Sequence, residues 1–158
     1  MRRLFAAAVF MALAACASPR PAHADPFTSA QPGLLHACVD AAGAQREALE
    51  GCLGALARPC IAQEGPSTMA EVLCWSAESQ TWDQIIAAAT TRLSAREQYR
   101  DPQRLAAANQ AWAAWLEAEC EYWAWQEGGG SGEQVDRVEC AARMSAERAI
   151  ALIAAAPR

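Results

Sequence analysis

The sequence predicts an all-α protein, a small bundle of about five antiparallel helices joined by disulfides, with no sheet. No stretch shows the strict polar–apolar alternation of a half-buried strand. Apolar residues instead recur at intervals of three and four over several segments, as on the buried face of a helix. The cysteines fall in pairs around turn signals, which is typical of disulfide-linked hairpins. A chain of 158 residues corresponds to one domain.

Residues 1–24 have the features of an export signal. Met1-Arg2-Arg3 precedes an apolar run over residues 4–15, which is too short to span a bilayer. Two processing sites fit. The lipobox-like Leu-Ala-Ala-Cys16 would leave a lipid anchor on Cys16, whereas Ala22-His23-Ala24 has the pattern of an ordinary signal-peptidase site. Either site places the mature chain outside the cytoplasm, and we expect it in the periplasm, where only Cys16 would attach it to a membrane.

The helical domain is expected over residues 34–157, after a linker at residues 25–33. Its first two helices are predicted over residues 34–42 and 45–63. Pro59 is expected to bend or end the last turn of the second helix, because proline lacks the backbone N–H that the helix interior requires.

The third helix shows the clearest periodicity. It follows the turn at Gly65-Pro66, with Ser67 or Thr68 as its N-cap, and extends toward Tyr99. Steps of three and four predict a buried seam, in which the two tryptophans are core residues: Val72, Trp75, Ser79, Trp82, Ile86, Ala89 and Leu93.

The fourth helix, over residues 105–126, is expected to be the element against which the rest of the chain packs. It holds four of the six tryptophans and has Asp101 as a candidate N-cap. The glycine-rich stretch 128–132 ends this helix, and a last helix follows over residues 132–157. One apolar stripe, widened on one side by further aromatic residues, is predicted along the fourth helix: Leu105, Asn109, Trp112, Leu116, Cys120 and Trp123, with Trp115, Tyr122 and Trp125 beside them.

Six cysteines lie beyond Cys16, and they allow 15 pairings in principle. In an antiparallel hairpin, residues equidistant from the turn face each other. The sequential cysteine pairs have their midpoints near Gly43, at Gly65-Pro66-Ser67 and at the centre of the glycine-rich stretch. The sequence therefore predicts three disulfides: Cys38–Cys52, Cys60–Cys74 and Cys120–Cys140.

Charge and motif content argue against several classes of protein. Without residues 1–24 the chain has ten arginines against 18 acidic residues, a formal charge of −8. Such a chain is a poor candidate for binding nucleic acid or anionic lipid and suits a cationic partner. Neither the cysteine spacing nor His36 fits a metal site, and no motif of a hydrolase or a phosphate-binding loop occurs. We therefore expect no enzyme activity, no metal and no cofactor, with Glu117, Glu119 and Glu121 as a solvated face.

Several motifs resemble the LprI-type lysozyme inhibitor N-terminal domain family over residues 34–153. The first half of the family's domain resembles Cys38-x13-Cys52, Cys74 and Trp82-Asp83-x-x-Ile86 in this chain. The second half is carried by Asn109-Gln110-Ala111-Trp112-x-x-Trp115-x-x-x-x-Cys120 and Cys140-x-x-Arg143-Met144-x-x-Glu147-Arg148. The chain departs from the family pattern where Leu-Asn-x-x-Tyr is usual and where an arginine is common near Trp115 or Leu116.

This resemblance implies an exported, non-catalytic envelope binding protein that inhibits lysozyme through its surface. The alternative hypothesis is a structural or assembly component of the periplasm with another protein partner; a hydrolase with dispersed acidic residues is a third. For the inhibitor, the acidic tip between the last two helices is the candidate contact site for a cationic lysozyme, with Glu127, Glu133 and Asp136 above Cys120–Cys140. The competing interpretation of this tip is a plain connector.

Overall fold

The computed structural model describes residues 30–96, 101–126 and 128–155. The proposed leader with Cys16, most of the linker and Glu127 lie outside these residues. Within them the chain forms helices and no strand, in agreement with the predicted all-α fold. The helices are α1 (Pro32–Ala42), α2 (Arg46–Glu50), α3 (Ala57–Glu64), α4 (Thr68–Ser94), α5 (Pro102–Gln126) and α6 (Ser131–Ala155).

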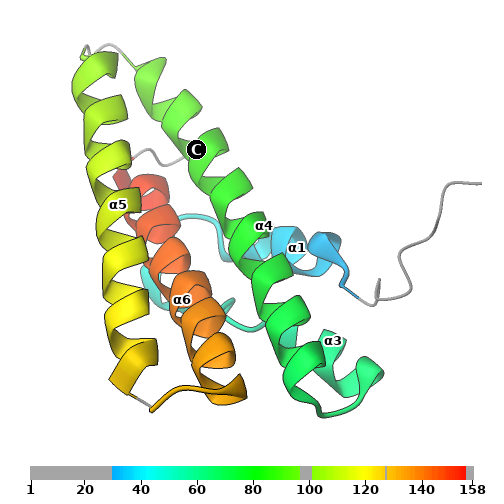
Figure 1. Cartoon of the computed structure of the whole chain (residues 1–158). Helices are drawn as coiled ribbons and strands as arrows, with labels where there is room; N and C mark the ends of the chain where they lie inside the picture. Colours follow the sequence, from blue (N-terminus) through cyan, green and yellow to red (C-terminus); the bar gives the residue numbers. More distant parts are fainter. Residues whose placement is uncertain (1–29, 97–100, 127, 156–158) are drawn as a thin grey trace, which may run out of the picture.

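The core lies between α4 and α6, which pack against each other along much of their length (Figure 1). In Figure 1, α5 covers one flank of this pair, while the short helices α1 and α3 lie on the opposite flank. Of the seam predicted on α4, Trp75, Trp82, Ala89 and Leu93 are buried, and Trp82 has no exposed surface. Val72, Ser79 and Ile86 are half-buried, and Ile85 is buried in place of Ile86. Ser67 is the N-cap of α4, and its hydroxyl accepts a hydrogen bond from the Ala70 N–H.

Helix α5 is a peripheral element, and the expectation that the chain is organised around it is wrong. Among its residues only Cys120 and Ala124 are buried. Trp123, predicted to point inward, is 54% exposed. The physical reason is that α5 packs mainly against α6 and only weakly against α4, so a single side of it is covered.

The predicted second helix is divided into α2 and α3 by a turn at residues 51–56. Gly54 has a φ of +85°, a left-handed conformation that side chains other than glycine's adopt at a cost. Because the chain turns before Ala57, Pro59 lies in the first turn of α3. Backbone N–H groups have no partner within the helix at this position, so the missing N–H of proline costs no hydrogen bond. The expectation that Pro59 bends or ends the last turn of a long helix is wrong for this reason.

The α2–α3 turn is held onto α4 by Glu78, a fully buried carboxylate. Its Oε1 accepts the Gly54 N–H at 2.6 Å, and its Oε2 accepts the N–H groups of Leu56 and Ala57 at 3.1 and 2.8 Å. The Trp82 indole donates to Oε1 at 3.3 Å. The Leu56 and Ala57 donors stand at the beginning of α3, where backbone N–H groups lack helical partners and favour a negative charge.

Three disulfides join neighbouring elements, and they are the pairs that the turn midpoints predict. Cys38–Cys52 ties α1 to the turn after α2, Cys60–Cys74 ties α3 to α4, and Cys120–Cys140 ties α5 to α6. The Cα–Cα distances are 5.7, 5.8 and 5.5 Å. In the chain-entropy model, each loop of this size contributes roughly 3 kcal/mol of stability.

Candidate functional site

The α5–α6 hairpin contains the sequence-predicted contact site. Gly128, Gly129 and Gly130 reverse the chain with φ angles of 84°, 87° and 93°, which glycine adopts at little cost. Beneath this turn, Met144 Sδ lies 3.5 Å from Cys120 Sγ and 3.9 Å from Cys140 Sγ. Trp112 and Leu116 pack against this sulfur cluster. The hairpin is therefore held together by a disulfide and by apolar packing about two helical turns below its end.

The structure places the two described tip carboxylates in different surroundings. Glu133 Oε1 accepts a hydrogen bond from Arg137 Nη2 at 2.8 Å, and Glu133 lines a hollow with Trp125, Gly128 and Gly129. One turn along α6, Asp136 lines a separate pocket above Cys140. That pocket has a volume of about 310 Å³, and its other walls are Trp123, Glu139 and Arg143. The predicted tip is thus two adjoining depressions.

The three glutamates of α5 do not behave alike. Glu117 and Glu121 are exposed, as expected for a solvated face. Glu119 accepts a hydrogen bond from the Trp123 indole at 2.8 Å, which holds this ring at the mouth of the Asp136 pocket. The Tyr122 ring meets the Trp123 ring edge-on, with centroids 5.3 Å apart.

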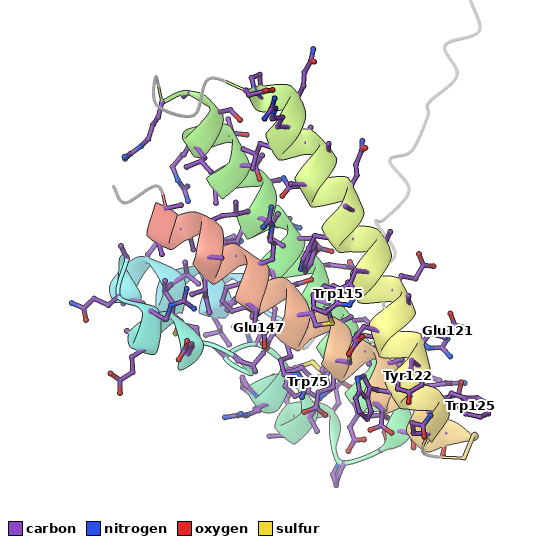
Figure 2. The ribbon with its side chains drawn as sticks, turned by 90° about the vertical axis from the view of Figure 1, so that its left-hand side faces the viewer. Trp75, Trp115, Glu121, Tyr122, Trp125 and Glu147 are labelled. Carbon is purple, nitrogen blue, oxygen red and sulfur yellow. A yellow bond between two sulfur atoms is a disulfide. The ribbon has the colours of Figure 1, made fainter. Side chains whose placement is uncertain are left out.

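A row of exposed aromatic side chains runs along the outer side of α5. Trp115, Tyr122 and Trp125 are 53%, 55% and 69% exposed. Figure 2 shows them following one another along the second half of the helix, with Glu121 beside them. The expectation that these rings widen a single buried stripe is therefore wrong. The sequence does contain a signal for this second apolar side of α5. The three–four pattern is repeated there by Trp115, Ala118, Tyr122 and Trp125.

Other residues of the motifs quoted above hold the helices together. Arg148 Nη2 and Nε donate to Asn109 Oδ1 at 2.6 and 3.2 Å, and Asn109 Nδ2 donates to Thr90 Oγ1 at 3.0 Å. This network joins α4, α5 and α6. Ser145 Oγ donates to Asp83 Oδ1 at 2.9 Å and links α6 to α4 again. The positions of Asn109, Arg148 and Asp83 are thus explained by packing.

The described residues show neither a metal-binding cluster nor a membrane-spanning helix. In the described ranges, no three His, Cys, Asp or Glu side chains are grouped so that they could hold a metal ion. None of the described helices combines the length and the apolar character needed to cross a membrane.

Over the described residues, the fold and the three disulfides define a small disulfide-linked helical module. The family model described as "Lysozyme inhibitor LprI" matches residues 60–152. This match covers more than half of the chain, and the protein therefore belongs to the LprI lysozyme inhibitor family. The match begins at Cys60, so α1, α2 and the Cys38–Cys52 disulfide precede it. No curated protein and no solved structure matches the chain.

Proposed function

We propose that this protein is an exported, non-catalytic inhibitor of lysozyme that acts in the periplasm by protein–protein contact. The observation that carries the proposal is the family match over residues 60–152, which spans α4 and α5, most of α6 and the last five residues of α3. Residues 1–24 serve as the export leader in this proposal, with Cys16 as the candidate lipid anchor, and residues 34–157 form the inhibitory domain.

The charge of the chain supports a cationic partner. The sequence pI is about 5.0, so the protein is negatively charged at neutral pH. Opposite net charges speed the encounter of two proteins and select among partners more than they raise affinity. At the end of the hairpin, Asp136 and Glu139 line one pocket together with Arg143, and the acidic residues outnumber the base there, while Glu133 is paired with Arg137. Among the proposed contact residues, Asp136 is therefore the better placed to meet a cation from the partner; Glu127 stays in the proposal as part of the same tip.

The hairpin supports inhibition by blocking access, without chemistry on the enzyme. The end of α5 is held to α6 by Cys120–Cys140, so its surface is ordered before the partner arrives. Binding by such a surface loses little conformational entropy.

The test is the activity of lysozyme on cell walls while the purified, oxidised protein is titrated in. We expect activity to fall in proportion to the amount of oxidised protein added, and to stay unchanged when the protein has first been reduced, alkylated and freed of reductant. Variants Glu133→Ala and Asp136→Ala should differ, with the larger loss of inhibition for Asp136→Ala. Full lysozyme activity at a large excess of folded protein would contradict inhibition and favour a structural or assembly role in the periplasm.

A further inference from the structure

Helix α5 has two apolar sides, and only one of them is used inside the molecule. The inner side carries Trp112, Leu116, Cys120 and Ala124, which pack toward α6. The outer side carries Ala111, Trp115, Ala118, Tyr122 and Trp125, all of which are exposed. From Trp115 to Trp125 this outer side extends for about 15 Å along the helix. We call these five residues the outer face of α5.

The exposed rings of Trp115, Tyr122 and Trp125 indicate a surface that contacts a partner. Single exposed apolar residues are ordinary, but a contiguous apolar patch marks an interaction surface. The small side chain of Ala118 separates Trp115 from Tyr122 on this side of the helix. Tryptophan and tyrosine are also the residues that most often dominate the energy of protein interfaces.

The charge around the outer face indicates the chemistry of that partner. Between residues 105 and 126 the chain has three glutamates and no basic residue, and Glu119 among them accepts the hydrogen bond of the Trp123 indole beside the Asp136 pocket. Glu121 lies beside Tyr122 and Trp125 in Figure 2. The C-terminal end of α5 adds the partial negative charge of its free carbonyl groups, and no basic residue in the last turn offsets it. Electron-rich rings next to carboxylates favour arginine and lysine side chains, which stack on the rings while pairing with the acids.

We propose that the outer face of α5 is the surface that docks the cationic partner, with Trp115, Tyr122 and Trp125 stacking against basic side chains of lysozyme. The inference rests on the proposed function for the identity of the partner. It moves the main contact from the hairpin tip to the side of α5, with Glu121 at its border. Cys120, on the opposite side of the same turns, fixes this part of the helix to α6.

The test measures binding and inhibition separately, with a cationic lysozyme as the probe and the full oxidised protein. The variant Trp115→Ala/Tyr122→Ala/Trp125→Ala removes the rings and should lower affinity by about 100-fold or more. The matched control, Leu34→Ala/Met69→Ala, removes exposed apolar side chains from α1 and α4 and should leave affinity within about twofold. Helical circular dichroism checks that each variant is folded. Trp125→Ala alone, which alters the most exposed of these rings, gives a second, milder variant.

Charge is tested independently of the rings. Glu121→Gln should lower the association rate constant and weaken its dependence on salt, whereas Glu47→Gln in α2 should change neither as much. Tyr122→Arg should weaken binding more than Tyr122→Ala, because it places a cation opposite a cationic partner.

The outcomes separate this inference from the proposed function. Binding that depends on the rings, without loss of lysozyme activity, would support the docking face and contradict inhibition. Inhibition and binding that both survive in the folded triple variant would overturn the docking face alone. A dimer of the free protein that the triple variant converts to monomers, with unchanged lysozyme binding, would identify a second copy as the occupant and overturn the inference. Absence of any binding by the wild-type protein would overturn both.

Discussion

The backbone N–H of Gly54 donates a hydrogen bond of 2.6 Å to the buried carboxylate of Glu78, which lies 24 residues further along the chain. The same carboxylate accepts the N–H groups at the start of α3 and the indole of Trp82. Glu78 therefore joins the α2–α3 turn, the beginning of α3 and the central tryptophan of α4. Hydrogen bonds to a charged acceptor are stronger than those between neutral groups, and a buried donor left unpaired is costly.

Replacing Glu78 by Gln should lower the free energy of unfolding by about 2–3 kcal/mol, because the amide nitrogen cannot accept the N–H groups that now face an oxygen. Urea unfolding with the disulfides intact measures this change. The control is Glu47→Gln on the exposed side of α2. A Glu78→Gln midpoint equal to that of the control would show that the carboxylate does not hold the turn.

Replacing Gly54 by Ala should cost about 1–2 kcal/mol, because its φ of +85° is unfavourable for an L-residue. A Cβ there would also meet the Arg58 side chain at 2.5 Å, although that flexible side chain can move. Gly132→Ala is the opposite case: Gly132 lies within α6, and the space that the added methyl group would occupy is open. It should raise stability by about 0.5–1 kcal/mol through helix propensity. Equal effects of both changes on thermal unfolding would contradict the assignment of strain to Gly54.

Asn109 and Arg148 should be energetically coupled, because Arg148 donates two hydrogen bonds to the Asn109 side chain. A double-mutant cycle with Asn109→Ala and Arg148→Ala should give a coupling energy of about 1–2 kcal/mol. The pair Arg137 and Glu133, which is more exposed, serves as the comparison and should give about 0.3–0.5 kcal/mol. Additive effects at Asn109 and Arg148 would show that this network does not join α5 to α6 energetically.

Removing Cys120–Cys140 should affect inhibition more than removing Cys38–Cys52. Each double Cys→Ser variant should lose about 3 kcal/mol of stability, since the loops they close differ little in length. Only Cys120–Cys140 holds the hairpin and the outer face of α5. Comparing inhibition with the folded fraction of each variant tests this difference. Inhibition that declines equally in both variants would mean that the disulfides act through overall stability alone.

Much of the fold follows from local sequence signals. The three–four pattern of apolar residues along α4 is uninterrupted, and the opposite side of this helix is more polar. The pattern therefore predicts which side of α4 is buried, and Trp75 and Trp82 lie on that side. The disulfides follow from the symmetry of hairpins about their turns, since each cysteine pair brackets glycine residues. Ser67 and Asp101 cap their helices as expected, with the Asp101 carboxylate accepting the Arg104 N–H at 3.0 Å.

The remaining features depend on contacts that a local pattern does not contain. Helix α5 offers two apolar sides, and periodicity cannot decide which one the molecule covers. Gly51 and Gly54 are individually weak breakers, and the turn between them needs the carboxylate of Glu78 from another helix. At helical spacing Glu78 has only Trp82 as a partner. The local sequence therefore does not predict that Glu78 holds the α2–α3 turn. The candidate tip was found from charge and glycine content, but the outer face of α5 required knowledge of which rings stay exposed.

The most direct measurement is calorimetric titration of the oxidised protein into a cationic lysozyme, with the residual lysozyme activity of the same mixtures assayed afterwards. We predict saturable one-to-one binding, with activity lost in parallel with occupancy. Heat of binding absent at all ratios, or an enzyme that stays fully active when saturated, would contradict the assignment of this chain as a lysozyme inhibitor.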